Sequence, residues 1–366
     1  MNKKEIAEIK KRFKKDCSIT RIAGCYVDSQ KNKVTTLNEM FLNLDEEELF
    51  KYLDLAKKIL TGKVNDNILT LSFSSGEVGG KRQNALLGLR DSKLKKEELL
   101  NVYYDQVIEN YQQEGNYLIL VYHDAYDVMK KGEDGQSQDE SEEVYEYILG
   151  VVCPVTLAKP ALGYRSDENE IGLRIRDWVV GMPTEGFLYP SFDDRTTNIH
   201  FCMVYSKDAM LPQKAWVENV LGCDIQLSAS MQKQKFLDMV ADIAEGDEEK
   251  EYVLLYELQG ALRDKKEEQG DDDICLETSV LKDVLEGVEE DADTIENVCS
   301  KYTEVFQSDQ KPMLSSVIDK KLVEEADKRR YIRELLKENE TLKKTIEELK
   351  KKYSVEFEAL KKRWKN

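Results

Sequence analysis

The first candidates for chemistry are the two histidines of the chain, His123 and His200. Each lies at or near the end of an apolar run that predicts a β-strand, and each has an aspartate nearby, Asp124 for the first and Asp194 for the second. If the two strands are neighbours, these imidazole and carboxylate groups could converge as a general-base or metal site. The two histidines lack the H-x-H or H-x-x-x-H spacing of a ligand pair, which favours hydrogen-bonded structural histidines instead.

Three arginines form the second candidate group. Arg174 and Arg176 alternate along a predicted strand and therefore share one face of it, and Arg195 follows in a polar segment further along. Two guanidinium groups side by side suit a phosphate or a carboxylate, so these arginines together with His200 are the best candidate for a ligand site. Ion pairing with nearby acids (Glu168, Glu170 and Asp193) is the favoured interpretation.

Other signatures of chemistry are missing from the sequence. It contains no G-x-S-x-G elbow, and none of its seven cysteines form a C-x-x-C pair. We therefore expect no metal and no cofactor, and we expect reduced thiols in a cytoplasm. The longest apolar run, residues 117–122, is far shorter than the ~20 residues of a membrane span, and charged residues directly after Met1 argue against a secretory signal.

Charge is segregated along the chain. The whole sequence has 72 acids and 54 bases, a net charge of −18, and the segment 238–296 alone carries 22 acids against 5 bases. Residues 328–366 are basic, with 14 bases and 7 acids. Three interpretations stay open: solvated helix faces, docking of the basic ends on the acidic segment, and nucleic-acid binding by the basic ends. The acids interspersed through the tail argue against nucleic acid.

The periodicity of apolar residues predicts an α+β fold. Residues 1–112 read as a mainly helical N-terminal region, and residues 113–245 contain strands spaced 8–12 residues apart, which is typical of a central antiparallel sheet with flanking helices. Residues 246–311 form an acidic helical segment, and residues 312–366 form a long basic C-terminal helix that starts at Pro312.

A seven-residue repeat of apolar side chains runs through the C-terminal helix and predicts a coiled coil. An asparagine at an a position is a device that fixes two-stranded register. We therefore expect self-association as a dimer through residues 332–353; docking on the chain's own globular part and a helix that seeks another protein partner are the alternatives. The predicted seam consists of Ile332, Asn339, Ile346 and Tyr353 at a and Leu335, Leu342 and Leu349 at d.

Several long strings in the first two thirds of the chain carry a family resemblance. They include LRDSKLK at 89–95, HDAYDV at 123–128 and RIRDWVV at 174–180. On these strings the chain resembles a family of Firmicutes proteins catalogued as a domain of unknown function, over about residues 1–260. The resemblance implies a cytoplasmic bacterial protein and supplies no activity and no ligand.

The sequence contains a clear heptad repeat but no complete set of catalytic groups, and the functional prediction is based on this contrast. We expect a non-enzymatic cytoplasmic binding or scaffold protein that self-associates through its C-terminal helix. The alternative is a hydrolase or phosphoryl-handling enzyme in which the sheet region forms a cleft. A second alternative is nucleic-acid binding through the basic termini. The enzymatic cleft would be lined by His123, Asp124, Asp194, His200 and the Arg174/Arg176 pair.

Overall fold

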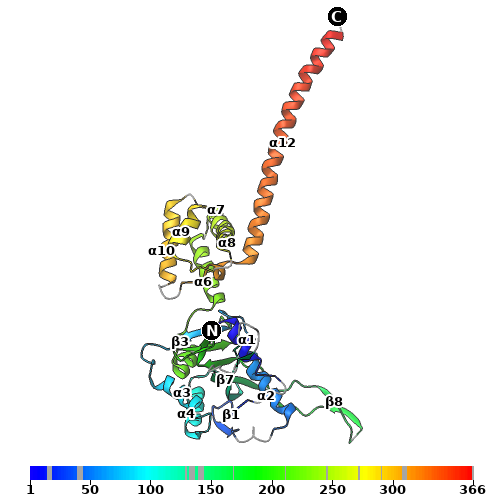
Figure 1. Ribbon diagram of the computed structural model, residues 1–366. Coiled ribbons are helices and arrows are strands. Elements are labelled where there is room, and N and C mark those ends of the chain that lie inside the picture. Colours follow the sequence, from blue (N-terminus) through cyan, green and yellow to red (C-terminus); the bar gives the residue numbers. More distant parts are fainter. Residues whose placement is uncertain are drawn as a thin grey trace. The chain divides into compact units, whose positions relative to one another are not determined.

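The computed structural model describes residues 1–14, 19–38, 44–127, 130–131, 137–138, 144–167, 169–210, 212–244, 246–270, 273–289, 291–306 and 311–364. The chain divides into two compact units, Met1–Ser230 and Met231–Asn366. Figure 1 shows the first unit as a sheet with helices and the second as a group of helices that ends in one long helix. Each unit is described by itself.

Unit 1 is built on one antiparallel sheet. Its strands follow the spatial order β2-β1-β4-β7-β11-β14-β3, and β10 pairs with the C-terminal end of β7. Every pairing between these strands is antiparallel, which confirms the predicted sheet type. The strands are β1 (Arg21–Val27), β2 (Lys33–Thr36), β3 (Ile68–Ser72), β4 (Asn116–Asp127), β7 (Val144–Leu157), β10 (Trp178–Val180), β11 (Glu185–Tyr189) and β14 (Phe201–Ser206).

Both faces of this sheet are buried, which explains the uninterrupted apolar run in β4. Side chains alternate between the faces of a strand. Ile119 and Val121 accordingly lie in one apolar core with α3 (Lys81–Asp91), α4 (Glu97–Asn110), α5 (Lys214–Trp216) and the π-helical turn η2 (Val217–Leu221). Leu118 and Leu120 lie in a second core with α1 (Lys3–Lys10) and α2 (Glu46–Ile59). We call these the α4 face and the α2 face.

Three small antiparallel hairpins complete the strands of unit 1. β5 (Lys130–Lys131) pairs with β6 (Ser137–Gln138), and β8 (Leu162–Arg165) pairs with β9 (Glu170–Leu173). β12 (Ser191–Asp193) pairs with β13 (Thr196–Asn198).

The observed division of the chain differs from the predicted one at residue 112. Residues 1–112 contribute β1, β2 and β3 to the same sheet as the later strands, with Ser72 of β3 opposite Phe201 of β14. The N-terminal region therefore supplies three strands of the sheet as well as helices. Strand pairing over more than a hundred residues unites segments that differ in local pattern, so the first unit extends to Ser230.

Unit 2 is helical. The aromatic rings of Phe236 and Tyr302 pack against each other with their centroids 6.4 Å apart, and both side chains are fully buried. The acidic segment and the C-terminal helix thus belong to one compact unit. Its helices are α6 (Ala229–Ala244), α7 (Glu248–Tyr252), η3 (Val253–Glu257, π-helical), α8 (Leu258–Glu268), α9 (Thr278–Glu286), α10 (Ala292–Val305), α11 (Leu314–Val317) and α12 (Lys320–Trp364).

The predicted long C-terminal helix is present as α12, which is 45 residues long, but it begins at Lys320 and not at Pro312. The carboxylate of Asp319 caps this start. It accepts hydrogen bonds from the backbone amides of Lys321 (2.9 Å) and Leu322 (3.3 Å). It also forms an ion pair with Lys233 (2.9 Å). Burial by itself raises the pKa of Asp319, but Lys233 and the two amides lower it overall.

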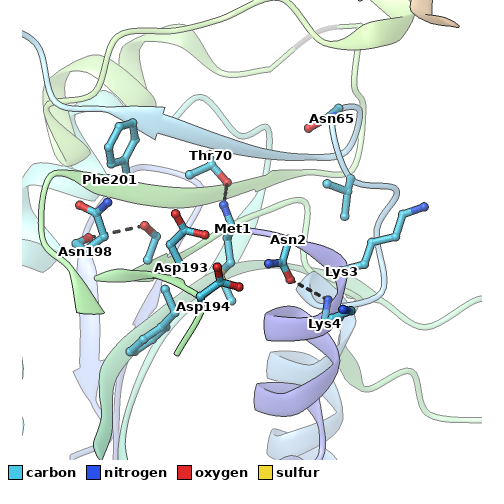
Figure 2. Close-up of a pocket in the computed structure, with 13 residues that line it drawn as sticks. Met1, Asn2, Lys3, Lys4, Asn65, Thr70, Asp193, Asp194, Asn198 and Phe201 are labelled. Carbon is cyan, nitrogen blue, oxygen red and sulfur yellow. Dashed lines mark hydrogen bonds between the residues drawn. The ribbon is translucent and has the colours of Figure 1, made fainter. Parts of the chain in front are cut away.

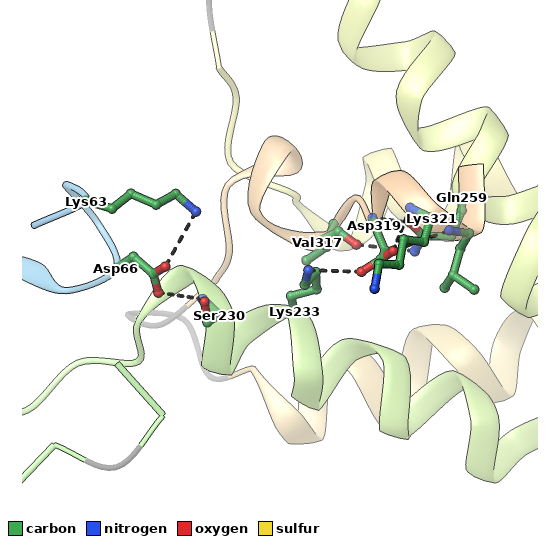
Figure 3. A network of polar contacts seen from close by, with 9 residues as sticks. Lys63, Asp66, Ser230, Lys233, Gln259, Val317, Asp319 and Lys321 are labelled. Carbon is green, nitrogen blue, oxygen red and sulfur yellow. Dashed lines mark hydrogen bonds and ion pairs between the residues drawn. The ribbon is translucent and has the colours of Figure 1, made fainter. Parts of the chain in front are cut away.

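The turn before α12 is fixed by a second buried polar group, shown with Asp319 in Figure 3. The Gln259 side chain donates to the carbonyl of Val317 (3.2 Å) and accepts from the amide of Asp319 (2.7 Å). Because Gln259 is fully buried, these bonds replace the water it loses. Figure 3 also draws Asp66 of unit 1, which accepts from Ser230 and Lys63.

Replacing Asp319 with alanine is expected to lower the stability of unit 2 by about 1–2 kcal/mol, because the first turn of α12 loses its cap and Lys233 loses its partner. Thermal unfolding followed by circular dichroism at 222 nm measures this. Ser354→Ala, an exposed change on the same helix, is the matched control. Equal melting temperatures for the two variants would contradict the capping role.

Candidate functional site

His123 and Asp124 are neighbours in sequence but lie on opposite faces of the sheet. Both belong to β4, in which odd-numbered residues reach the α4 face and even-numbered residues reach the α2 face. Both side chains are buried, His123 fully and Asp124 with 1% exposed. The imidazole and the carboxylate therefore have separate surroundings.

His123 is a buried imidazole with one hydrogen-bond partner. Its Nε2 lies 3.2 Å from Oε1 of Glu146 on the neighbouring strand β7, and its Nδ1 has no partner among the described residues. Burial lowers the pKa of His123, while Glu146 acts in the opposite direction. A neutral imidazole that is held by one carboxylate and shielded from solvent fits a structural histidine better than a general base.

Asp124 forms a buried ion pair with Arg12. The Nε of Arg12 donates to its Oδ2 at 2.8 Å and the Nη2 of Arg12 donates to its Oδ1 at 3.3 Å. The hydroxyls of Thr20 and Tyr147 each donate at 3.5 Å. The guanidinium of Arg12 also stacks on Tyr126, 4.7 Å from the ring centroid. This arrangement fastens the N-terminal segment to the α2 face and leaves the carboxylate no open coordination position.

Replacing Arg12 with methionine is expected to destabilise unit 1 by about 2 kcal/mol. The apolar stem is retained, but Asp124 stays buried with only two long hydroxyl contacts. Urea unfolding followed by the fluorescence of Trp216, which is fully buried in this unit, measures the loss. Lys11→Met changes an exposed charge that pairs with Glu8 on the same helical turn, and we expect it to cost less than about 0.5 kcal/mol. Equal costs for both changes would contradict the anchoring role.

His200 lies away from His123. It immediately precedes β14, and both β7 and β11 separate that strand from β4. Three strand spacings of about 4.8 Å put the two backbones roughly 14 Å apart. His200 is exposed, and its backbone amide donates to the side chain of Asn198 at 3.1 Å. The structure therefore does not bring the two histidines together.

Asp194 and Arg195 are the two central residues of the β12–β13 hairpin. Their φ angles are +42° and +67°, and both are exposed. Positive φ at both central positions is typical of a type I′ turn, so the backbone conformation explains this polar segment. The amide of Arg195 donates to Oε1 of the buried Glu5 at 3.1 Å, which ties the turn to α1.

Arg174 and Arg176 lie elsewhere, just after the β8–β9 hairpin, and both are exposed. The Nε of Arg176 donates to the carbonyl of Ala158 at 2.6 Å, and Arg174 makes no ion pair with any described residue. The two arginines lie between β9 and β10 and not in a strand as predicted, and Arg195 and His200 belong to a different hairpin region. The predicted four-residue ligand site is therefore not assembled.

A cleft of about 710 Å³ lies where α1 meets the β12–β13 hairpin. Figure 2 shows Met1 at its centre, with its amino group donating to the hydroxyl of Thr70 at 2.7 Å and with Asp193 and Asp194 nearby. Burial lowers the pKa of this amino group, and the charge of Asp193 acts in the opposite direction. The described lining residues are Met1, Asn2, Lys3, Lys4, Val64, Asn65, Thr70, Ser191, Phe192, Asp193, Asp194, Asn198 and Phe201.

This cleft combines ammonium groups with carboxylates and amides, so it suits a small polar molecule that carries charges of both signs. Its described lining contains neither histidine nor cysteine. Local sequence patterns do not indicate this cleft, because its residues come from three distant segments of the chain. Only Asp194 among the predicted site residues lines it.

Two kinds of feature are absent from the described part of the chain, a metal-binding cluster and a membrane-spanning helix. No group of three or more His, Cys, Asp or Glu side chains there is arranged to hold a metal ion. None of the helices there is both long enough and apolar enough to cross a membrane.

The comparison with protein families gives a match over residues 1–353 to the family described as "Domain of unknown function (DUF4317)". The chain belongs to the DUF4317 family. No match was found among curated proteins. The resemblance in the sequence, which extended over about residues 1–260, is thus confirmed and its extent is corrected. DUF4317 also includes the acidic helices and α12 as far as Tyr353, where the last clean heptad ends.

The beginning of α12 in this DUF4317 member docks on the acidic segment. Arg330 and Arg333 pair with Glu257 of η3 at 3.2 and 3.6 Å, and Arg333 also lies 3.8 Å from the ring centroid of Tyr252. Arg263 of α8 pairs with Asp327 of α12. The basic tail and the acidic segment therefore meet within unit 2, over the first part of α12 only.

From Ile332 onward the predicted seam of α12 is exposed. Its six apolar members have between 39% and 63% of their surface exposed, and the Asn339 side chain donates to the carbonyl of Leu335 within the same helix. Every described residue from Tyr331 onward has an exposed side chain where that side chain is described. The stripe extends over about three heptads of α12. The six residues are Ile332, Leu335, Leu342, Ile346, Leu349 and Tyr353.

Proposed function

We propose that this DUF4317 protein is a cytoplasmic, non-enzymatic binding or scaffold protein of bacteria that self-associates through residues 332–353 of α12. The observation that carries the proposal is the exposed heptad stripe on a helix that is anchored by its first part to unit 2. Burying such a stripe against a second copy removes apolar surface from water on both chains. Because α12 is anchored, pairing of two such helices joins two whole chains.

The residues around the stripe favour a pair of parallel helices in register. Asn339 occupies an a position, where two asparagines facing each other satisfy their amides only in a parallel, in-register dimer. Glu338 at g and Lys343 at the next e position carry opposite charges, which suits pairing across that seam. The intrahelical bond of Asn339 to Leu335 leaves its amide oxygen for such a partner.

A truncated chain that ends at Glu334 tests the proposal, because it keeps the contacts of Arg330 and Arg333 with Glu257 and removes the rest of the seam. Sedimentation equilibrium should give a lower subunit number for the truncated chain than for the full chain. Circular dichroism should show the same unfolding of the remaining helices, apart from the lost length. If both chains sediment as monomers at tens of micromolar, the proposed self-association is wrong.

A further inference from the structure

The apolar stripe of α12 continues past Tyr353, where the heptads end. Three further large apolar side chains follow at intervals of four, three and four residues. They are 55–90% exposed, and α12 is one uninterrupted helix as far as Trp364 (Figure 1). We call these three the distal residues; they are Phe357, Leu360 and Trp364.

The distal residues lie on the same side of α12 as the predicted seam. An α-helix turns by about 100° per residue. Relative to Tyr353, the three distal side chains are therefore rotated by about +40°, about −20° and about +20° in chain order. The seam residues from Leu342 to Tyr353 fall within the same arc of about 80°. One straight stripe thus extends from the seam to Trp364.

Glu356 marks a change of phase in the repeat and not the end of the stripe. After Tyr353 at an a position, the heptad places the next seam residue at Glu356, whereas the stripe resumes one position later, at Phe357. Such a shift is a stutter, which locally unwinds a left-handed coiled coil. Ile346 and Phe357 are eleven residues apart, close to three full turns, so both side chains still face one partner.

A repeat in the sequence supports this change of phase independently. The string ENETLK at 338–343 returns as EFEALK at 356–361, with both glutamates, the leucine and the lysine unchanged. The two strings are eighteen residues apart. Eighteen residues make about five turns of an α-helix, so each residue of the second string lies on the same line along the helix as its counterpart in the first.

The repeat assigns coiled-coil positions to the second string through its alignment with the first. Glu356 becomes a g residue at the rim of the contact, and Lys361 becomes the e residue five positions later. These are the two positions that pair across a parallel dimer, and here they carry opposite charges. In the alignment, Glu356 matches Glu338 (g), Phe357 matches Asn339 (a), Leu360 matches Leu342 (d) and Lys361 matches Lys343 (e).

The contacts of the single chain leave these groups accessible to a partner. The Nζ of Lys361 lies 4.8 Å from the ring centroid of Phe357 and 3.1 Å from Oε1 of Glu358, all within one turn of the helix. Glu356 makes no ion pair with any described residue. Its carboxylate can therefore accept Lys361 of a second copy without breaking another ion pair.

We propose that the contact between two copies of α12 continues through the stutter as far as Trp364, with Phe357 and Trp364 at a positions and Leu360 at d. This inference rests on the proposed self-association through residues 332–353 and extends it. The occupant of the distal face is a second copy, because the face continues the seam on one side of the helix. The pairing of g with e charges is then self-complementary in a parallel, in-register dimer.

A lipid surface fits the distal face less well. An amphipathic helix that lies on a membrane must turn its apolar side toward the lipid. The distal residues share that side with the seam, so they cannot face lipid while the seam faces a second helix. The stretch 354–361 also contains two acids and one base, without the basic surplus that attracts anionic headgroups.

Insertions after Ser354 in the full chain test the continuation by changing its phase. Two inserted alanines rotate the distal residues by about 200°, away from the seam. Three inserted alanines restore a step of seven residues from Tyr353 to Phe357, and this chain is the matched control. In sedimentation equilibrium, the two-alanine chain should dissociate at least about 100-fold more readily than the wild type, because three apolar side chains per copy lose their partners. The three-alanine chain should stay close to the wild type.

Trp364 provides a direct signal for the same contact. It is 90% exposed in the single chain, so pairing should shift its emission to the blue and protect it from acrylamide as the protein concentration rises. A Trp178→Phe background removes the other exposed tryptophan, while Trp216 is fully buried and gives a constant signal. The two-alanine insertion should abolish the concentration dependence. Circular dichroism at 222 nm checks that α12 remains helical.

Charge reversal tests the assigned g and e positions. Glu356→Lys and Lys361→Glu should each weaken the dimer by about two- to five-fold at low salt, because each places like charges at both rims of the contact. The chain with both changes should recover the wild-type affinity. Equal affinities for all four chains would exclude this assignment.

The outcomes separate this inference from the proposed function. A full chain that stays monomeric up to about 100 μM would overturn both. A dimer that is equally stable in the wild type, in the two-alanine chain and in a chain that ends at Tyr353 would leave the seam in place and show that the continuation is wrong. A blue shift of Trp364 with vesicles of phosphatidylcholine and phosphatidylglycerol, but not with protein concentration, would assign the distal face to a membrane surface instead.

Discussion

Replacing Leu342 and Ile346 with serine is expected to weaken self-association through α12 by at least a thousandfold. Each buried aliphatic side chain of a seam contributes about 1.5–3 kcal/mol, and each change removes two side chains per dimer. The two changes together therefore remove roughly 6–12 kcal/mol from the free energy of association, although coupling between neighbours reduces the sum. Both residues are about half exposed in the single chain, so the folded units lose little.

The dissociation constant from sedimentation equilibrium measures this effect. Val355→Ser is the matched control, because Val355 is an equally apolar, exposed residue of α12 that lies off the seam at a c position. Asn339→Ile provides a second check. This change should strengthen association and relax the preference for an assembly of two helices. Seam and off-seam changes with the same effect would show that α12 does not pair through the heptad.

Replacing Glu185 with glutamine is expected to stabilise unit 1 at pH 8 by several kcal/mol and to leave it almost unchanged at pH 5. Glu185 begins β11 and is only 4% exposed. Its Oε1 accepts a hydrogen bond from the hydroxyl of Ser206 at 3.0 Å, while its Oε2 has no partner among the described residues. Burial raises the pKa of Glu185 to about 8, against the lowering effect of the Ser206 hydroxyl.

The sign of the pH dependence follows from this raised pKa. Between the ordinary value of 4.5 and about 8, the folded chain holds a proton on Glu185 that the unfolded chain has lost. The contribution of this group to stability is therefore fully present below about pH 4.5 and is lost as the pH rises to about 8, at about 1.4 kcal/mol per pH unit. Glutamine, which stays neutral, removes this loss.

Urea unfolding of both chains at pH 5, 6, 7 and 8, followed by Trp216 fluorescence, measures the difference. Trp178 and Trp364 are largely exposed in the folded chain, so the change in signal comes mainly from unit 1. Glu109→Gln, an exposed change on α4, should leave the pH dependence as it is. Parallel curves for the wild-type and Glu185→Gln chains would show that Glu185 is ionised throughout this range.

Separation of the predicted catalytic groups has a common structural cause. His123 and Asp124 point to opposite faces because they are consecutive on a strand, and His200 is three strands away. Arg174 and Arg176 lie between β9 and β10, and β10 pairs with the C-terminal end of β7. Proximity in sequence to acids, which suggested the site, does not determine which strands become neighbours.

Local patterns in the sequence were sufficient for features that depend on near neighbours. The alternation and length of apolar runs predicted an antiparallel α+β fold, and the heptad predicted a long C-terminal helix; both are confirmed. Periodicity determines these features because a helix or strand must turn its apolar side chains toward one direction. Pairing of α12 with a second copy remains a prediction.

Only the tertiary structure decided the features that depend on strand order and on side chains far apart in the chain. Asp124 finds its partner Arg12 across 112 positions. Gly150 is required in β7 because a Cβ there would lie 2.1 Å from the Phe187 ring of β11. Such pairings arise from which strands lie side by side, and the alternation within each strand is the same whichever neighbour it receives. The sequence by itself therefore determined the elements, and long-range packing determined where their polar side chains meet.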